Sequence, residues 1–271
     1  MKALVVTVAP GDVEVASDAL WGLGVVAVEE RTAGDLVELW TSLGDEPVAP
    51  DLPWPWRFEE VDEAVADTWR EFAVPIDIEP GVVVRPAWVP YDATPGVTVL
   101  HIEPGSTFGM GDHPTTVLSL RATRRLVREG CTVLDVGCGS GVLAIAAMRF
   151  GAGRAVGIDI APAAVPVTTA NAAANGVVVD VSTTDLADVE GEFDLVLANI
   201  LAPALVGLAA DLRRVVAPGG RLVISGILAD RHEHVLAALA PLEVEHTEVL
   251  DGWAAVTLRH PPARSASTSM R

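Results

Sequence analysis

Short apolar runs alternate with longer amphipathic stretches in the carboxyl-terminal part of the chain. From about Val97 onward this pattern predicts alternating strands and helices, which favours an α/β fold with a doubly wound parallel sheet. We expect strands at residues 133–136, 155–158, 177–181, 194–198 and 221–225, and helices at residues 141–150, 162–175 and 203–216. Pro166 lies inside a predicted helix, where its missing N–H should bend or delay that helix.

The amino-terminal residues follow another pattern, in which strands surround a single helix. We expect strands at residues 3–8, 25–30 and 36–40 and a helix at residues 13–23, followed by a Pro- and Asp-rich loop at residues 46–55. A second Pro-rich region, residues 75–95, is interpreted as a linker and lead-in. The predicted organisation is a small α+β domain (1–60), a linker and lead-in (61–96), a doubly wound domain (97–260) and a disordered tail (261–271).

The composition of the chain limits the classes of partner that the protein is expected to bind. The chain has 271 residues, of which half are hydrophobic, and its 18 basic and 37 acidic residues give a formal net charge of −19. That charge repels phosphate backbones, so we expect no direct nucleic-acid substrate and favour a basic protein partner. The arginines at 121, 124, 125 and 128 are interpreted as the solvated face of one helix.

The two cysteines and the hydropathy of the chain indicate its compartment. Cys131 and Cys138 form no CxxC pair and have no histidine at ligand spacing, so we interpret them as reduced thiols and expect no metal site. No apolar run approaches the roughly 18 residues of a membrane span, and the amino terminus lacks a secretory pattern. We therefore expect a cytoplasmic protein without a membrane anchor, acting as a monomer.

A glycine-rich loop follows the strand at residues 133–136. Gly137, Gly139 and Gly141 alternate along the chain, which allows a sharp turn and a close approach of the backbone to a ligand. A dinucleotide fingerprint needs a glycine at position 142, where this chain has Val142. The spacing therefore favours S-adenosylmethionine over NAD as the ligand.

Two acidic residues accompany this loop. Asp159 ends the next strand, about 20 residues further on, where a carboxylate can accept hydrogen bonds from both ribose hydroxyls or can cap the following helix. Asp135 ends the first strand, where it can orient the glycine loop or the ammonium group of the donor.

The segment from Phe108 to Thr116 precedes a helix predicted to run to about Glu129. Thr115 and Thr116 fall at the predicted helix start, where hydroxyls and free N–H groups suit the carboxylate of the methionine moiety or serve only as caps. His113 is interpreted as ordering this loop, with general-base catalysis as the alternative.

Asn199 follows the buried strand at residues 194–198 and should reach the carboxyl edge of the sheet beside the glycine loop. Its amide can accept a hydrogen bond from a substrate amine and direct the nitrogen lone pair at a methyl group. A turn at the strand end is the structural alternative. Because methyl transfer is an in-line displacement, positioning and desolvation can supply most of the catalysis.

Six segments occur in an order and spacing that resemble a known family: FGMGDHPTT, LDVGCGSGVLAIAA, GIDI, NAAANG, ANILA and PGGRLVISGIL. Over residues 97–260 the chain resembles the PrmA family, the methyltransferases of the eleventh protein of the large ribosomal subunit. The resemblance implies a class I, Rossmann-like S-adenosylmethionine domain and a small amino-terminal substrate-recognition domain. It also implies methylation of lysine side chains and of an N-terminal amine.

The resemblance further implies donor contacts at Thr116, Gly137, Asp159 and Asn199, with Phe108 and Gly109 in a lid loop. Met110 and Asp112 replace two threonines of the family's usual FGTGTHPTT loop, and Ala161 replaces an acidic residue. Three alternatives stay open at this point. They are methylation of another protein lysine, methylation of a small-molecule amine, and a non-catalytic factor that binds S-adenosylmethionine.

Overall fold

The computed structural model of the chain describes residues 2–21, 23, 25, 28–41, 43, 49–60, 74–86, 88–92, 94–103 and 113–261. The chain divides into two compact units, one that ends at Val74 and one that begins at Pro75.

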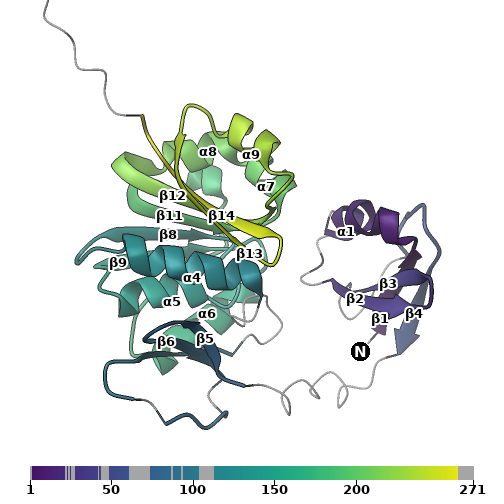
Figure 1. The fold of residues 1–271 in the computed structure, drawn as a ribbon, viewed down its shortest axis with the longest axis horizontal. Helices are drawn as coiled ribbons and strands as arrows, with labels where there is room; N and C mark the ends of the chain where they lie inside the picture. The colour runs from purple at the N-terminus through teal and green to yellow at the C-terminus, as the bar shows by residue number, and fades with distance from the viewer. Residues whose placement is uncertain are drawn as a thin grey trace, which may run out of the picture. The chain divides into compact units, whose positions relative to one another are not determined.

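The first unit is an antiparallel sheet with one helix on a face (Figure 1). Its strands lie in the order β2-β3-β1-β4. The helix packs its buried Ala16 and Leu20 against apolar side chains of the central strands, among them Leu4 and Leu39. The elements are β1 (Lys2–Val8), a 3-10 turn (Pro10–Asp12), α1 (Val13–Trp21), β2 (Glu29–Ala33), β3 (Leu36–Thr41) and β4 (Trp56–Glu60).

Two strands of this unit differ from the expectation. The strand expected at residues 25–30 lies instead at Glu29–Ala33. A two-residue turn at Gly34 and Asp35 pairs Ala33 with Leu36 and fixes its register against β3. Gly34 takes the positive φ of 67° that such a turn requires. β4 was not predicted, and it completes the sheet by pairing with β1.

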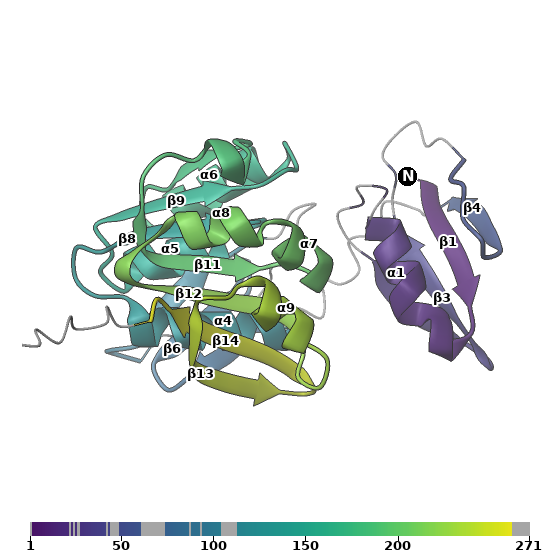
Figure 2. The same cartoon turned by 90° about the horizontal axis from the view of Figure 1, so that it is seen from above.

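The second unit contains a seven-stranded sheet in the order β10-β9-β8-β11-β12-β14-β13. The first five strands are parallel, and β14 runs antiparallel to both β12 and β13 (Figure 2). The strands are β8 (Thr132–Val136), β9 (Arg154–Ile158), β10 (Asp180–Ser182), β11 (Phe193–Asn199), β12 (Val216–Leu228), β13 (Glu243–Leu250) and β14 (Trp253–Arg259). The chain order reverses between β8 and β11, and ligands of such sheets bind beside that point.

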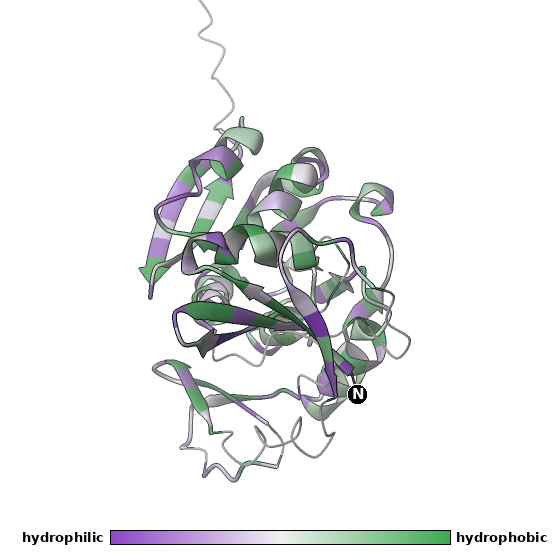
Figure 3. Ribbon diagram, turned by 90° about the vertical axis from the view of Figure 1, so that its right-hand side faces the viewer, coloured by the Kyte–Doolittle hydropathy of each residue, from purple (hydrophilic) through white to green (hydrophobic). Residues whose placement is uncertain are grey.

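Helices cover both faces of this sheet, which confirms the doubly wound prediction. Alternate strand residues point to opposite faces, so Val133 and Leu197 pack with α4, α5 and α6, whereas Leu134 and Val196 pack with α7, α8 and α9. Apolar positions are accordingly interspersed with polar ones along the ribbon (Figure 3).

Except for α9, which the sequence did not predict, the helices begin and end within a few residues of the predicted positions. They are α4 (Pro114–Leu126), α5 (Val142–Arg149), α6 (Ala164–Ala174), α7 (Ala202–Gly207), α8 (Ala209–Arg214) and α9 (Glu233–Ala238), with a 3-10 turn at Leu186–Asp188. Because α6 begins at Ala164, Pro166 lies in its first turn, where a backbone N–H has no helical partner to lose. The helix expected at residues 203–216 is divided at Leu208 into α7 and α8. Within the described chain, no helix is long and apolar enough to cross a membrane.

Residues interpreted as linker and lead-in contribute a second sheet to this unit. β5 (Ile76–Glu79), β6 (Val82–Arg85) and β7 (Thr98–His101) pair side by side, and Ile78 and Leu100 are buried in the same core as α4 and α5. The prolines of the region occupy positions outside these three strands, so the strands keep their backbone donors.

Arg124 and Arg125 of α4 are exposed, as a solvated face predicts, but the arginines of this helix also bind neighbouring strands. Arg121 donates from Nε to the carbonyl of Ile78 at 2.8 Å and pairs with Glu248 at 3.0 Å. Arg124 pairs with Glu79, and Arg125 lies 3.7 Å from Glu248. These contacts join α4 to β5 and β13, two strands that the hydrophobic pattern did not predict.

Candidate active site

The glycine loop turns sharply where β8 ends. Gly137, Gly139 and Gly141 all have positive φ, at 71°, 52° and 79°. A Cβ atom at Gly137 would lie 2.4 Å from Cγ2 of Ile200, and one at Gly141 would lie 2.6 Å from Cγ2 of Thr168. Glycine is therefore required at these two positions for both backbone conformation and space.

Asp159 joins this loop to the end of β9. Its Oδ2 accepts a hydrogen bond from the nitrogen of Gly139 at 2.8 Å, and its Oδ1 accepts one from the nitrogen of Ala161 at 2.9 Å. Each carboxylate oxygen has a further lone pair, so the half-buried side chain can still accept from two hydroxyls. The alternative of a helix cap is not realised, because α6 begins at Ala164 without a side-chain cap. The prediction of a ribose ligand is compatible with this geometry.

Asp135 lies beneath the loop and is only 1% exposed. Its Oδ2 accepts from the nitrogen of Ala144 at 3.1 Å, in the first turn of α5. Burial, helped by the charge of Asp159, raises the pKa of Asp135 to about 7. Burial also raises the pKa of the Cys138 thiol, which favours its protonated form.

The start of α4 is built from the predicted HPTT residues. His113 is the N-cap, and its Nδ1 lies 2.8 Å from Oγ1 of Thr115 while its ring packs edge-on against Trp253. His113 therefore caps α4, and the loop that it is predicted to order lies outside the described residues. Thr116 is fully buried, and within the described residues its Oγ1 has no hydrogen-bond partner. A buried hydroxyl without a partner fits a site that receives a polar ligand group.

Asn199 is the last residue of β11 and is half-buried. The parallel register places Ala198 beside Val136, so Asn199 and Gly137 follow neighbouring strand ends. Asn199 itself is paired in register with Ser225 of β12. The strand ends thus bring the predicted amide to the same edge as the glycine loop.

The sequence interpretation gave no role to Ser225, Gly226 or Ile200. Ser225 Oγ donates to the carbonyl of Ala254 at 3.0 Å and lies 3.4 Å from the carbonyl of Thr115. Gly226 has a φ of 83° and leaves no room for a Cβ against the backbone of Ile200. The register of β12 and β14 shifts at this point, and bulges of this kind often re-aim residues beside active sites. The PGGRLVISGIL motif includes Ser225 and Gly226, but the sequence alone does not indicate what these two residues contact.

The predicted residues gather in two linked groups. Asp159 is hydrogen-bonded to Gly139 of the glycine loop, and Asp135 fastens the first turn of α5, which follows that loop. Ser225 connects the Thr115–Thr116 helix start to the strand beside Asn199. Phe108 and Gly109, like Met110 and Asp112, lie outside the described residues.

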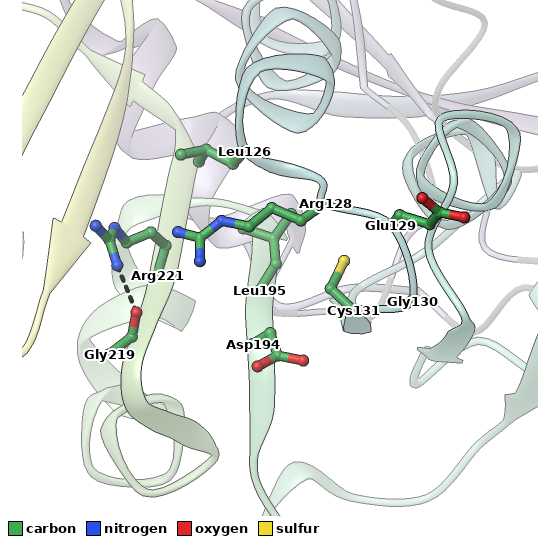
Figure 4. Close-up of a pocket in the computed structure, with 9 residues that line it drawn as sticks. All are labelled: Leu126, Arg128, Glu129, Gly130, Cys131, Asp194, Leu195, Gly219 and Arg221. Atoms are coloured by element: carbon green, nitrogen blue, oxygen red, sulfur yellow. Dashed lines mark hydrogen bonds between the residues drawn. The ribbon is translucent and has the colours of Figure 1, made fainter.

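A separate cavity of about 290 Å³ lies at the opposite edge of the sheet (Figure 4). It adjoins Cys131, which precedes β8, and Asp194 near the start of β11, whereas the glycine loop and Asn199 follow the ends of these strands. The side chain of Arg221 there is engaged by Glu245 at 2.6 Å. This cavity is therefore not the candidate donor site. No group of three or more potential metal-ligating side chains occurs in the ranges that the structure describes.

This sheet order, with the glycine loop after β8 and an acidic residue after β9, defines the class I fold of S-adenosylmethionine-dependent methyltransferases. Residues 24–261 match the family model described as ribosomal protein L11 methyltransferase (PrmA). The chain belongs to the PrmA family.

Individual relatives and a solved structure agree with this assignment. The chain is 48% identical over 188 residues to the ribosomal protein L11 methyltransferase of Geobacter metallireducens, covering 69% of this chain and 62% of the relative. It is 46% identical over 207 residues to that of Geobacter sulfurreducens, covering 75% and 69%. The crystal structure of ribosomal protein L11 methylase from Lactobacillus delbrueckii subsp. bulgaricus aligns with a TM-score of 0.64 at 31% identity, covering 69% of this chain and 98% of that one. The first of these matches thus spans less than two thirds of the relative's length.

Proposed function

We propose that this protein transfers methyl groups from S-adenosylmethionine to ribosomal protein L11, at lysine side chains and the N-terminal amine. The observation that carries the proposal is the glycine loop fastened to the Asp159 carboxylate, in a chain of the PrmA family. The net charge of −19 is consistent with a basic protein substrate rather than nucleic acid.

The residues at this edge suit the three polar parts of the donor. Asp159 is assigned to the ribose hydroxyls, and Gly137, Gly139 and Gly141 are assigned to the close approach of the backbone to the donor. Thr115 and Thr116, at the start of α4, are assigned to the methionine carboxylate, for which the unpartnered Oγ1 of Thr116 is a donor. Asp135 is proposed to orient the glycine loop or the ammonium group. Phe108 and Gly109 remain predicted contacts.

Asn199 is assigned the catalytic position. When bound, S-adenosylmethionine supplies a methyl group activated by its sulfonium. The Asn199 amide oxygen accepts a hydrogen bond from the substrate amine and holds the nitrogen lone pair in line with that methyl group. A lysine amine, with an ordinary pKa of about 10.4, must first lose a proton, which a poorly solvated site favours. The nitrogen–carbon bond forms as the sulfur–carbon bond breaks, and the amine proton leaves to water.

The first unit is proposed to recognise the substrate, and the second to hold donor and catalytic residues. This division follows the predicted domains at residues 1–60 and 97–260. We further propose that the protein acts in the cytoplasm as a monomer and makes no direct contact with nucleic acid.

Incubation of purified protein with methyl-labelled S-adenosylmethionine and purified ribosomal protein L11 tests this function. We expect label on L11, with mass spectrometry locating it on lysines or the N-terminal amine, and a fall in kcat of at least about 100-fold in Asn199→Ala. Label on other proteins but not on L11 would identify a different substrate. Binding of the donor without any transfer would favour the non-catalytic alternative.

A further inference from the structure

Asn171 of α6 and its C-cap Asn175 bind the backbone at the open edge of β7 and just beyond it with their side chains. His101 donates its backbone N–H to Oδ1 of Asn175 at 2.9 Å, and Nδ2 of Asn175 donates to the His101 carbonyl at 2.7 Å. Asn171 makes the same pair of bonds with the backbone of Glu103, at 3.0 and 2.8 Å. Each side-chain amide therefore makes the pair of backbone hydrogen bonds that a residue of a neighbouring strand would make.

The residue spacing along the helix and along the strand allows the two asparagines to bind His101 and Glu103 at the same time. Residues four apart on a helix are separated by about 6 Å along its axis, and residues two apart on a strand by about 6.6 Å. Both asparagines are 4% exposed, so neither can exchange these bonds for bonds to water. The other edge of β7 is already paired with β6.

Asn171 makes one contact that Asn175 does not. Its Nδ2 also donates to the carbonyl of Ser140, within the glycine loop, at 2.9 Å. The equivalent second bond of Asn175 goes to the carbonyl of Asn171, inside α6 itself. Thr168, one turn before Asn171, donates to the neighbouring carbonyl of Gly139 at 3.0 Å. One face of α6 therefore holds two consecutive carbonyls of the loop.

We propose that Asn171 is a positioning residue of the donor site, which fixes the Ser140 carbonyl of the glycine loop against the backbone of Glu103. A single amide thereby joins the loop after β8 to the residues that follow β7. Because Ser140 lies between Gly139 and Gly141, loss of this bond removes the Asn171 restraint from the centre of the loop, while Asp159 and Thr168 still hold Gly139. The proposal rests on the proposed binding of S-adenosylmethionine at this loop.

Asn175 provides a matched control, since each side chain donates two hydrogen bonds, accepts one and is equally buried. The test compares Asn171→Ala with Asn175→Ala by calorimetric titration with S-adenosylhomocysteine and by kinetics with varied S-adenosylmethionine. We expect Asn171→Ala to raise Kd and KM about five- to tenfold, as the loss of one fixing hydrogen bond predicts, with kcat nearly unchanged. Asn175→Ala should lose similar thermal stability but keep Kd and KM within about twofold of the wild-type values.

If the wild-type protein binds S-adenosylhomocysteine and the two variants bind it with equal Kd values, the positioning role of Asn171 is overturned. A wild-type protein that does not bind S-adenosylhomocysteine would instead overturn the proposed function. If the alanine variants do not fold, Asn171→Ser and Asn175→Ser are compared in the same way, because serine removes less volume. Unfolding of Asn171→Ser but not of Asn175→Ser would also contradict the proposal. It would show that Asn171 is needed for the stability of the fold and not specifically for the donor site.

Discussion

The carboxylate of Asp159 accepts a hydrogen bond from the backbone nitrogen of Gly139, with 2.8 Å between Oδ2 and N. The two residues come from neighbouring strand ends, β9 and β8, so this bond sets the position of the loop relative to the acid that is proposed to bind the ribose. A ligand that contacts both the loop and Asp159 therefore binds a preorganised site. Preorganisation reduces the conformational entropy that the protein loses on binding.

Substitution of Gly137 should impair the donor site through contact with Ile200. Gly137→Ala forces a Cβ to within 2.4 Å of Ile200 Cγ2 and places an L-residue at a φ of 71°. Gly176→Ala is the matched control, because Gly176 has a φ of 66° but open space around it. Both variants should lose about 1 kcal/mol of unfolding free energy from the left-handed conformation, and Gly137→Ala more.

Titration with S-adenosylhomocysteine separates the effect of the contact with Ile200 from the effect of the left-handed backbone conformation. Gly137→Ala should bind more weakly by at least about tenfold, while Gly176→Ala should bind as the wild type does. Equal affinities in both variants would show that the loop does not contact the ligand.

The buried Asp135 should make stability depend on pH. Its pKa is raised to about 7 in the folded protein, whereas an unfolded aspartate titrates near 3.9. Between about pH 4 and pH 7 the folded state therefore binds more protons than the unfolded state, so this residue lowers the free energy of unfolding as the pH rises through that window.

Asp135→Asn removes the titration but keeps an oxygen that can accept from Ala144. Its stability relative to wild type should increase from about pH 4 to about pH 7 and then level off. Urea unfolding midpoints across this range measure the difference. A difference that does not change with pH would contradict an elevated pKa for Asp135.

Arg121 should contribute to stability although it was interpreted as a solvated residue. Arg121→Met removes the bond to the Ile78 carbonyl and the ion pair with Glu248, in which both side chains are only about 30% exposed. We expect a loss of about 1 kcal/mol in unfolding free energy, measured with urea. Arg154→Met, which breaks the exposed pair with Asp180, should have almost no effect. An equal loss in both variants would show that the α4 contacts add nothing beyond surface charge.

The central strands and the site motifs could be predicted because their signals are local. Residues 133–136 and 194–198 are apolar except for one aspartate each, Asp135 and Asp194, and the loop glycines mark their own turn. β13 could not be found in this way, because as an edge strand it is exposed along most of its length and carries Glu243, Glu245 and Glu248. β5 and β6 are short and lie among prolines, so composition favoured a linker there.

The unpredicted parts of the site depend on contacts between distant segments. Asn171 is 68 residues from Glu103 in the chain, and no periodicity within α6 indicates that its amide completes a strand edge. Ser225 likewise reaches Thr115 across 110 residues. The NAAANG and VISGIL segments supported the family resemblance, but their physical roles required the fold.

The most direct measurement is calorimetric titration of the wild-type protein and of Asp159→Asn with S-adenosylhomocysteine, and of the wild type with NAD. We predict that the wild type binds S-adenosylhomocysteine and not NAD. Asp159→Asn should bind about 10- to 100-fold more weakly, because hydrogen bonds to a charged acceptor are lost. Undiminished binding by Asp159→Asn, or preferential binding of NAD, would contradict a donor site at this edge of the sheet.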